Sequence, residues 1–105
     1  MIITEHTGAD GTVRLTLAGE LDLGTVQALS EQVEQTLTGH RPPGLVLDLT
    51  ELTFCDSTGT GALIEARTAA LDSGASFQVT NPHGVTELSL QIVGVHDLLT
   101  QPTPA

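Results

Sequence analysis

The residues best suited to chemistry stand together at Asp56, Ser57 and Thr58, where an apolar segment gives way to polar residues and Gly59. Such a turn predicts a passage from a strand into a helix, whose first amide groups lack partners within the helix. These amides and the positive end of the helix dipole favour a negative group, so a phosphate on Ser57 would be accommodated. An equally physical alternative is that Asp56 or Ser57 simply caps the helix.

Catalytic and metal-binding chemistry is not indicated by the rest of the chain. Ser57 lacks the Gly-x-Ser-x-Gly surroundings of a hydrolase nucleophile, so we do not expect an enzyme. The histidines lack the spacing of metal ligands, and we expect neither a metal site nor a cofactor; they are His6, His40, His83 and His96. The single cysteine, Cys55, is interpreted as a buried small side chain rather than a thiol sensor.

Composition limits the architecture and the class of partner. A chain of 105 residues with 39% hydrophobic residues fits one compact domain. Thirteen acidic and three basic residues give a net charge of −10, which disfavours nucleic acid and anionic lipid and favours a partner with a basic face. No segment approaches the ~20 apolar residues of a membrane span, and no secretion signal is evident, so we expect a cytoplasmic protein.

The N-terminal half predicts a hairpin, a helix and a central strand. Apolar residues alternate from Val13 to Leu17, and Ile2 and Ile3 indicate a strand before the turn at residues 8–11, so an antiparallel hairpin is expected. An amphipathic helix follows, with an N-cap at Thr25 and a stop at Gly39. Residues 45–49 are nearly all apolar, which predicts a central strand covered on both faces.

The C-terminal half predicts two further helices around a strand. The first helix spans residues 57–71, and the strand lies around Phe77. The next helix is expected to start with Asn81 as its N-cap and to end at Gly94; its apolar residues are Val85, Leu88 and Ile92. A last short helix or strand and a frayed tail follow. This order predicts an α/β fold with a four- to five-stranded mixed sheet flanked by helices.

Two segments resemble the motifs of a known family. The string from Leu47 to Gly59 resembles the signature of STAS domains in bacterial anti-sigma factor antagonists, in which an apolar strand leads to Asp-Ser-Ser/Thr-Gly. The upstream segment Leu-Ala-Gly-Glu-Leu-Asp, which ends at Asp22, resembles the second family motif at a fitting separation. The resemblance extends over nearly the whole chain and implies a STAS domain at residues 1–100 and a flexible tail at residues 101–105.

The resemblance also implies a function. An antagonist of this family binds an anti-sigma factor while unphosphorylated, which frees the sigma factor. The anti-sigma factor is often a serine kinase that uses ATP and Mg²⁺ to phosphorylate the serine after the motif aspartate, here Ser57, and a phosphatase reverses the reaction. The chain is then a kinase substrate and binding module. The implied partner-binding residues are Asp22, Asp56, Ser57, Thr58, Gly59 and Thr60.

The resemblance is incomplete, and it leaves alternatives open. Thr60 stands where the family usually has a bulkier apolar residue, and Cys55 stands where methionine or another apolar residue is common. We expect Thr60 on the docking surface, where the smaller side chain would redirect partner choice. Asp22 either has a functional role, shaping the partner surface or helping to position the acceptor hydroxyl, or it stabilises a turn. The alternative function is an interaction module of another complex, such as a stressosome-like scaffold or a lipid-transport accessory.

Overall fold

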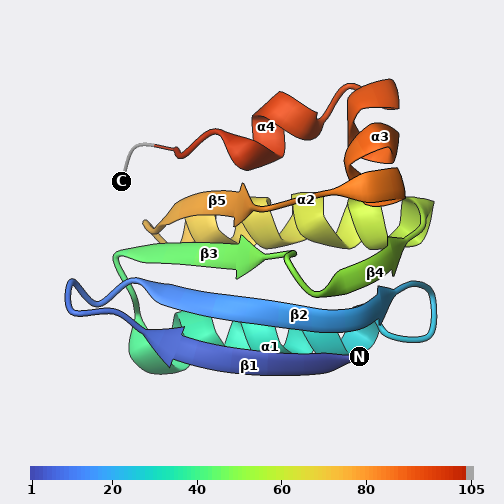
Figure 1. The fold of residues 1–105 in the computed structure, drawn as a ribbon. Coiled ribbons are helices and arrows are strands. Elements are labelled where there is room, and N and C mark those ends of the chain that lie inside the picture. Colours follow the sequence, from blue (N-terminus) through green and yellow to red (C-terminus); the bar gives the residue numbers. More distant parts are fainter. Residues whose placement is uncertain (104–105) are drawn as a thin grey trace.

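The computed structural model describes residues 1–103 as a single mixed sheet with helices packed against it (Figure 1). In chain order the elements are β1 (Ile2–Thr7), β2 (Val13–Leu21), α1 (Val26–His40), β3 (Gly44–Asp48), β4 (Leu52–Cys55), α2 (Ser57–Asp72), β5 (Ser76–Thr80), α3 (Gly84–Ile92) and α4 (His96–Thr100). The strand order is β1-β2-β3-β5, and β4 pairs with β2. Only the β1–β2 hairpin is antiparallel. The predicted α/β class and mixed sheet are confirmed.

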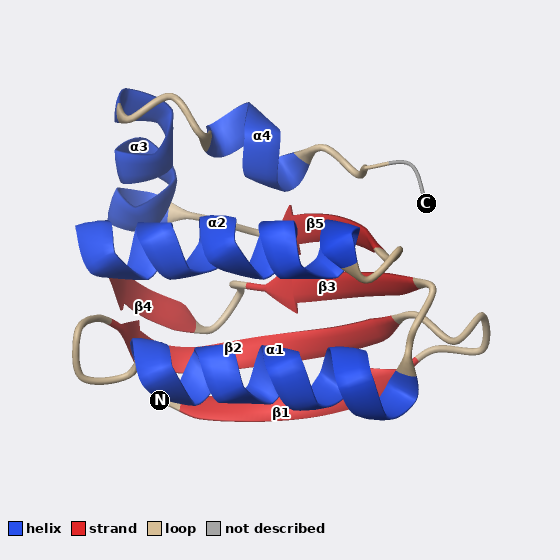
Figure 2. Ribbon diagram, turned by 180° about the vertical axis from the view of Figure 1, so that it is seen from behind, coloured by secondary structure: helices blue, strands red, loops and turns tan. Residues whose placement is uncertain are grey.

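The hydrophobic core lies on one face of the sheet, beneath α1 and α2, which run side by side (Figure 2). The alternating residues of β2 that face these helices are fully buried, as Leu15 and Leu17 illustrate. On β3, in contrast, Val46 and Asp48 are only partly buried. The prediction that this strand is covered on both faces is therefore wrong, because the two long helices pack on the same face.

The strand β4 was not predicted from the sequence. Leu52–Cys55 is only four residues long, and Thr53 and Phe54 within it are exposed, so the segment carries too little periodicity to be recognised. It pairs with the last residues of β2, after a shift of register between Gly19 and Glu20. This pairing brings the start of α2 to the carboxyl end of β2.

The ends of α1 differ from the simplest capping pattern. Thr25 is the N-cap residue as predicted, but its side chain makes no cap hydrogen bond. Its Oγ1 donates instead to the carbonyl oxygen of Glu20, at 2.9 Å. The predicted stop at Gly39 is wrong, because the helix continues to His40. The next residue, Arg41, has left-handed backbone with φ 46°. The chain ends the helix there because Pro42 disfavours helical backbone in the residue before it.

The start of α3 also departs from the prediction. Asn81 does not cap the helix: it has φ 57°, and its Nδ2 donates to Asp48 Oδ1 at 3.1 Å. The N-cap residue is His83, whose Nε2 lies 2.9 Å from the carbonyl oxygen of Thr50. Both side chains thus tie the segment before α3 to the end of β3 and the loop after it. The predicted stop near Gly94, with φ 81°, is confirmed.

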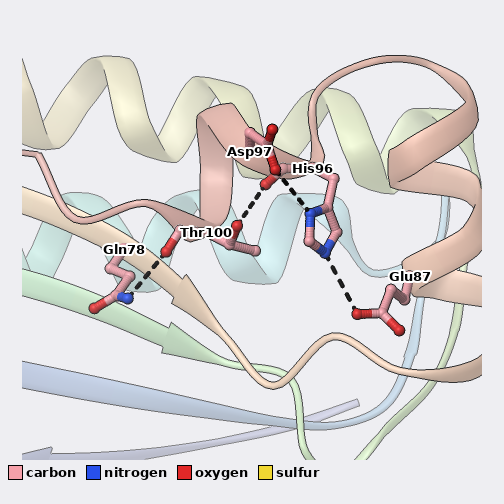
Figure 3. A network of polar contacts seen from close by, with 5 residues as sticks. All are labelled: Gln78, Glu87, His96, Asp97 and Thr100. Carbon is pink, nitrogen blue, oxygen red and sulfur yellow. Dashed lines mark hydrogen bonds and ion pairs between the residues drawn. The ribbon is translucent and has the colours of Figure 1, made fainter.

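The last helix, α4, is held by polar contacts beside the sheet edge (Figure 3). Gln78 of β5 donates through Nε2 to the carbonyl oxygen of Thr100, at 2.9 Å. His96 Nε2 lies 3.4 Å from Glu87 on α3, and His96 Nδ1 lies 3.4 Å from Asp97. These contacts join α3, α4 and β5. Of the two predicted possibilities for this segment, helix or strand, the structure has the helix.

The segment after α4 continues along the edge strand. The backbone N–H of Phe77 donates to Thr103 Oγ1 at 2.7 Å, and the N–H of Thr103 donates to the carbonyl oxygen of Phe77 at 3.2 Å. The first residues of the predicted tail, 101–103, therefore lie against β5. Residues 104 and 105 lie outside the described residues. The domain boundary at residue 100 and the flexibility of the tail stay predictions.

Candidate functional site

The turn from β4 into α2 leaves Ser57 accessible at the start of a long helix. Asp56 is the N-cap residue, with extended backbone, and its Oδ1 accepts a hydrogen bond from the N–H of Gly59 at 2.8 Å. Of the two capping candidates, the structure therefore selects Asp56. Ser57 is exposed, and its hydroxyl makes no hydrogen bond to any atom of residues 1–103. The backbone N–H groups of Ser57 and Thr58 likewise find no acceptor within this range.

Replacing Asp56 with alanine is expected to destabilise the fold by about 1 kcal/mol, because the N–H of Gly59 then loses its acceptor at the helix start. Urea unfolding of the parent and the variant measures this difference. Asp56→Asn is the matched control, since an asparagine side chain caps equally well and should retain most of the stability. Equal losses in both variants would mean that the charge of Asp56, rather than its cap, stabilises the turn.

The end of β2 positions this turn through a close approach. The N–H of Asp56 donates to the carbonyl oxygen of Leu21 at 3.3 Å, continuing the pairing of Leu21 with Cys55. Gly59 lies against the same place: a Cβ on it would lie 2.5 Å from the Leu21 carbonyl oxygen and 2.8 Å from Cys55 Sγ. Only glycine fits at this position. The location of Ser57 thus depends on tertiary packing as well as on the local capping motif.

Asp22 lies in the loop that follows β2, and its hydrogen bonds are made within that loop. Its Oδ1 accepts a hydrogen bond from the N–H of Gly24 at 3.0 Å, and its backbone N–H donates to Thr25 Oγ1 at 2.9 Å. No hydrogen bond joins Asp22 to Ser57 within residues 1–103. Between the two alternatives left by the sequence, these contacts support the turn-stabilising role, and contact of Asp22 with a partner stays a prediction.

Two of the predicted partner-binding residues are buried. Gly59 and Thr60 face the interior; Thr60 is 9% exposed, and its Oγ1 lies 3.9 Å from Cys55 Sγ. The prediction that Thr60 lies on the docking surface is therefore wrong for this structure, because Thr60 follows the cap on the inner side of α2. The predicted residues that remain accessible are Asp22, Asp56, Ser57 and Thr58.

Cys55 is a buried thiol, in agreement with the sequence interpretation. Its side chain is 7% exposed. Burial raises its pKa, and the nearby charge of Asp56 acts in the same direction, while the hydrogen bond with Thr60 opposes them. A raised pKa keeps the sulfur protonated and unreactive. The thiol therefore acts as a small packing group behind Ser57.

Sequence reasoning missed two apolar residues that flank the Ser57 turn. Phe54 is 43% exposed on β4, and Leu23 is 77% exposed in the loop after β2. Alternation along a strand gives a signal for the first of these, because a buried Cys55 requires Phe54 to point to the opposite side. Leu23 carries no such signal, since a loop has no fixed periodicity.

The structure also bears on metal binding and membrane insertion. Among residues 1–103, no three His, Cys, Asp or Glu side chains gather closely enough to hold a metal ion. No helix in the described part of the chain is long and apolar enough to cross a membrane.

A mixed sheet with two long helices on one face, and an exposed serine at the start of the second, fits the STAS domain that the sequence resemblance implies. The chain belongs to the family described as Mlab, STAS domain, whose model matches residues 5–100. The family resemblance proposed from the sequence is thereby confirmed over nearly the whole chain.

Three similar proteins illustrate the relationship. The anti-sigma-F factor antagonist RsfB of Mycobacterium tuberculosis is 28% identical over 101 residues, which cover 87% of this chain and 81% of RsfB. An anti-sigma factor antagonist from Mycobacterium paratuberculosis has a TM-score of 0.78 at 24% identity, covering 93% of this chain and 83% of that chain. Phosphorylated SpoIIAA of Bacillus has a TM-score of 0.69 at 18% identity, covering 97% and 92%. The two structural likenesses establish the shared fold.

Proposed function

We propose that this chain is an anti-sigma factor antagonist that binds a serine-kinase-type anti-sigma factor while Ser57 is unphosphorylated. The single observation that carries the proposal is the exposed hydroxyl of Ser57, which is free of hydrogen bonds to residues 1–103 at the start of α2. Relatives of the same fold named as antagonists support it. The bound anti-sigma factor releases its sigma factor, and the antagonist acts in the cytoplasm without catalysis of its own.

The switch is a phosphoryl transfer carried out by the partner. The kinase moves the γ-phosphoryl group of Mg²⁺-bound ATP to Ser57 Oγ; the bond to ADP breaks, and the hydroxyl proton is lost. The free N–H groups of Ser57 and Thr58 and the positive end of α2 can accommodate the new charge. A phosphatase restores the hydroxyl by adding water across the phosphate ester. The phosphate therefore acts at the interface and requires no refolding of the antagonist.

Charge favours the same class of partner. The chain carries 13 acidic and three basic residues, so a basic surface on the anti-sigma factor would be drawn to it at long range. Asp22 and Asp56 flank Ser57 with carboxyl groups, which disfavours nucleic acid at this site. The accessible predicted contacts are Asp22, Asp56, Ser57 and Thr58.

A second function is favoured by one observation. Thr60, which stands where the family usually has a bulkier apolar residue, is buried, so the surface around Ser57 lacks a protruding apolar side chain at this position. The chain would then be a STAS interaction module of another complex, such as a stressosome-like scaffold or a lipid-transport accessory, with no role for a sigma factor.

Incubation of the purified chain with each serine-kinase-type anti-sigma factor of its own genome, ATP and Mg²⁺ tests the proposal. We expect one of them to transfer a phosphate, and mass spectrometry of the peptides to locate it on Ser57. Ser57→Ala should accept none, whereas Thr58→Ala, the matched control for the acceptor site, should still carry its phosphate on Ser57. A phosphate on Thr58 would contradict the assigned site. Absence of both binding and phosphorylation with every candidate would favour the alternative module.

A further inference from the structure

The accessible residues around Ser57 are too few and too polar to hold a protein partner by themselves. A stable interface covers roughly 800 Å² per partner, and its affinity comes mainly from a few buried apolar or aromatic side chains. Residues 56–58 offer only small polar side chains, Thr60 is turned inward, and the flanking Leu23 and Phe54 are single apolar side chains. An interface centred on Ser57 must therefore extend over neighbouring apolar surface.

The outer side of α3 carries three of the exposed large apolar side chains of the described residues. Val85 is 74% exposed, Leu88 54% and Ile92 75%. Their spacing of three and four residues places them on one side of the helix. The other side packs inward through Thr86 and Leu90, which are 5% and 0% exposed. We call Val85, Leu88 and Ile92 the α3 face. A helix that is apolar on both sides is normally covered on both.

The α3 face lies at the same end of the molecule as Ser57. In Figures 1 and 2, α3 lies at the end of the molecule where β4 leads into α2. α3 also packs against β4, which leads into the Ser57 turn and carries the half-exposed Phe54. The net charge of −10 suits a partner with basic groups. One partner can thus press on Ser57 and cover the α3 face together.

We propose that the α3 face, continued by Phe54, is the apolar anchor of the interface that Ser57 switches. The partner is the anti-sigma factor, which would present an apolar groove with a basic rim beside its kinase site; this inference rests on the proposed function. Ser57 then controls binding by charge, while α3 supplies most of the affinity. This division explains how a chain without an apolar docking residue at Thr60 can still bind its partner.

Two other arrangements are outcomes of the test. A second copy of this chain could cover the α3 face. A groove of about 650 Å³ between α1 and α2, which begins at Thr58, could instead receive the partner. Gly61 lines this groove, and a Cβ added there meets nothing within 4 Å, so Gly61→Leu projects a side chain into the groove from an unobstructed position.

The experiment compares the affinities of five proteins for the anti-sigma factor by calorimetry: the parent, Ile92→Gln, Ile2→Gln, Gly61→Leu and Ser57→Asp. Ile2 is the matched control, because it is 70% exposed on β1, away from α3. We expect Ile92→Gln to weaken binding about tenfold or more. Ile2→Gln and Gly61→Leu should bind like the parent. Because Ile92 is exposed, the thermal unfolding of its variant should match that of the parent.

The outcomes separate this inference from the proposed function. If Ser57→Asp binds weakly while Ile92→Gln binds like the parent, the function stands and the α3 anchor is wrong. If Gly61→Leu is the only apolar-surface variant that weakens binding to the anti-sigma factor, the partner binds in the groove and the proposed α3 anchor is wrong. If sedimentation shows a dimer of the parent that Ile92→Gln dissociates, a second copy covers α3 and the inference fails. If the parent binds no anti-sigma factor, both proposals fail.

Discussion

Phosphorylation of Ser57 is expected to weaken binding to the anti-sigma factor by a few hundredfold, about 3 to 4 kcal/mol. A phosphate adds about −1.5 to −2 charges and three oxygens to a site that the partner must cover. Within the antagonist, the start of α2 stabilises the phosphate, so the phosphate makes the free energy of binding less favourable rather than lowering the stability of the fold. At the interface, the bulk and hydration of the phosphate and its repulsion from nearby carboxylates of the partner oppose docking. Calorimetry with enzymatically phosphorylated and unmodified chain measures the effect directly.

Two substitutions separate the charge from the loss of the hydroxyl. Ser57→Ala should bind like the unmodified chain and resist phosphorylation. Ser57→Asp should bind at least about tenfold more weakly, a smaller effect than phosphate because it adds a single charge. Thr58→Ala controls for any change of side chain at the helix start, since Thr58 is also exposed and carries a hydroxyl. Tight binding by Ser57→Asp would refute the electrostatic switch.

Gly59→Ala is expected to destabilise the fold by about 2 to 3 kcal/mol, the size typical of forced overpacking. The added Cβ would lie 2.5 Å from a backbone oxygen, that of Leu21, which cannot rotate away as a flexible side chain can. The end of β2 or the first turn of α2 must therefore move. Since the same turn carries Ser57, the variant should also be phosphorylated more slowly.

Gly61→Ala is the matched control for this effect. It lies two residues further along the same helix, and its added Cβ meets nothing within 4 Å. Removing a helical glycine without a clash should stabilise the chain by about 0.5 to 1 kcal/mol. Urea unfolding of both variants measures the two opposite shifts of midpoint. Stabilisation by Gly59→Ala would show that the turn packs less tightly against β2 than the structure indicates.

The sequence by itself determined the features that depend on neighbouring residues. The alternation of Leu15 and Leu17 on β2, and the polar turn before α2, predicted the hairpin and the helix start that carries Ser57. A strand has a fixed period of two and a cap acts within three or four residues, so such signals are readable along the chain. The family motifs then supplied the proposed role of Ser57, which geometry alone does not give.

Tertiary structure decided which side of each helix meets the rest of the molecule. Periodicity groups Val85, Leu88 and Ile92 on one side of α3, but it does not say that Leu90, on the other side, enters the core. Likewise, the cap at Asp56 orients α2, yet only packing against β2 turns Thr60 inward and requires Gly59. Burial depends on which surfaces of distant segments fit together, and that fit is absent from any local pattern of residues.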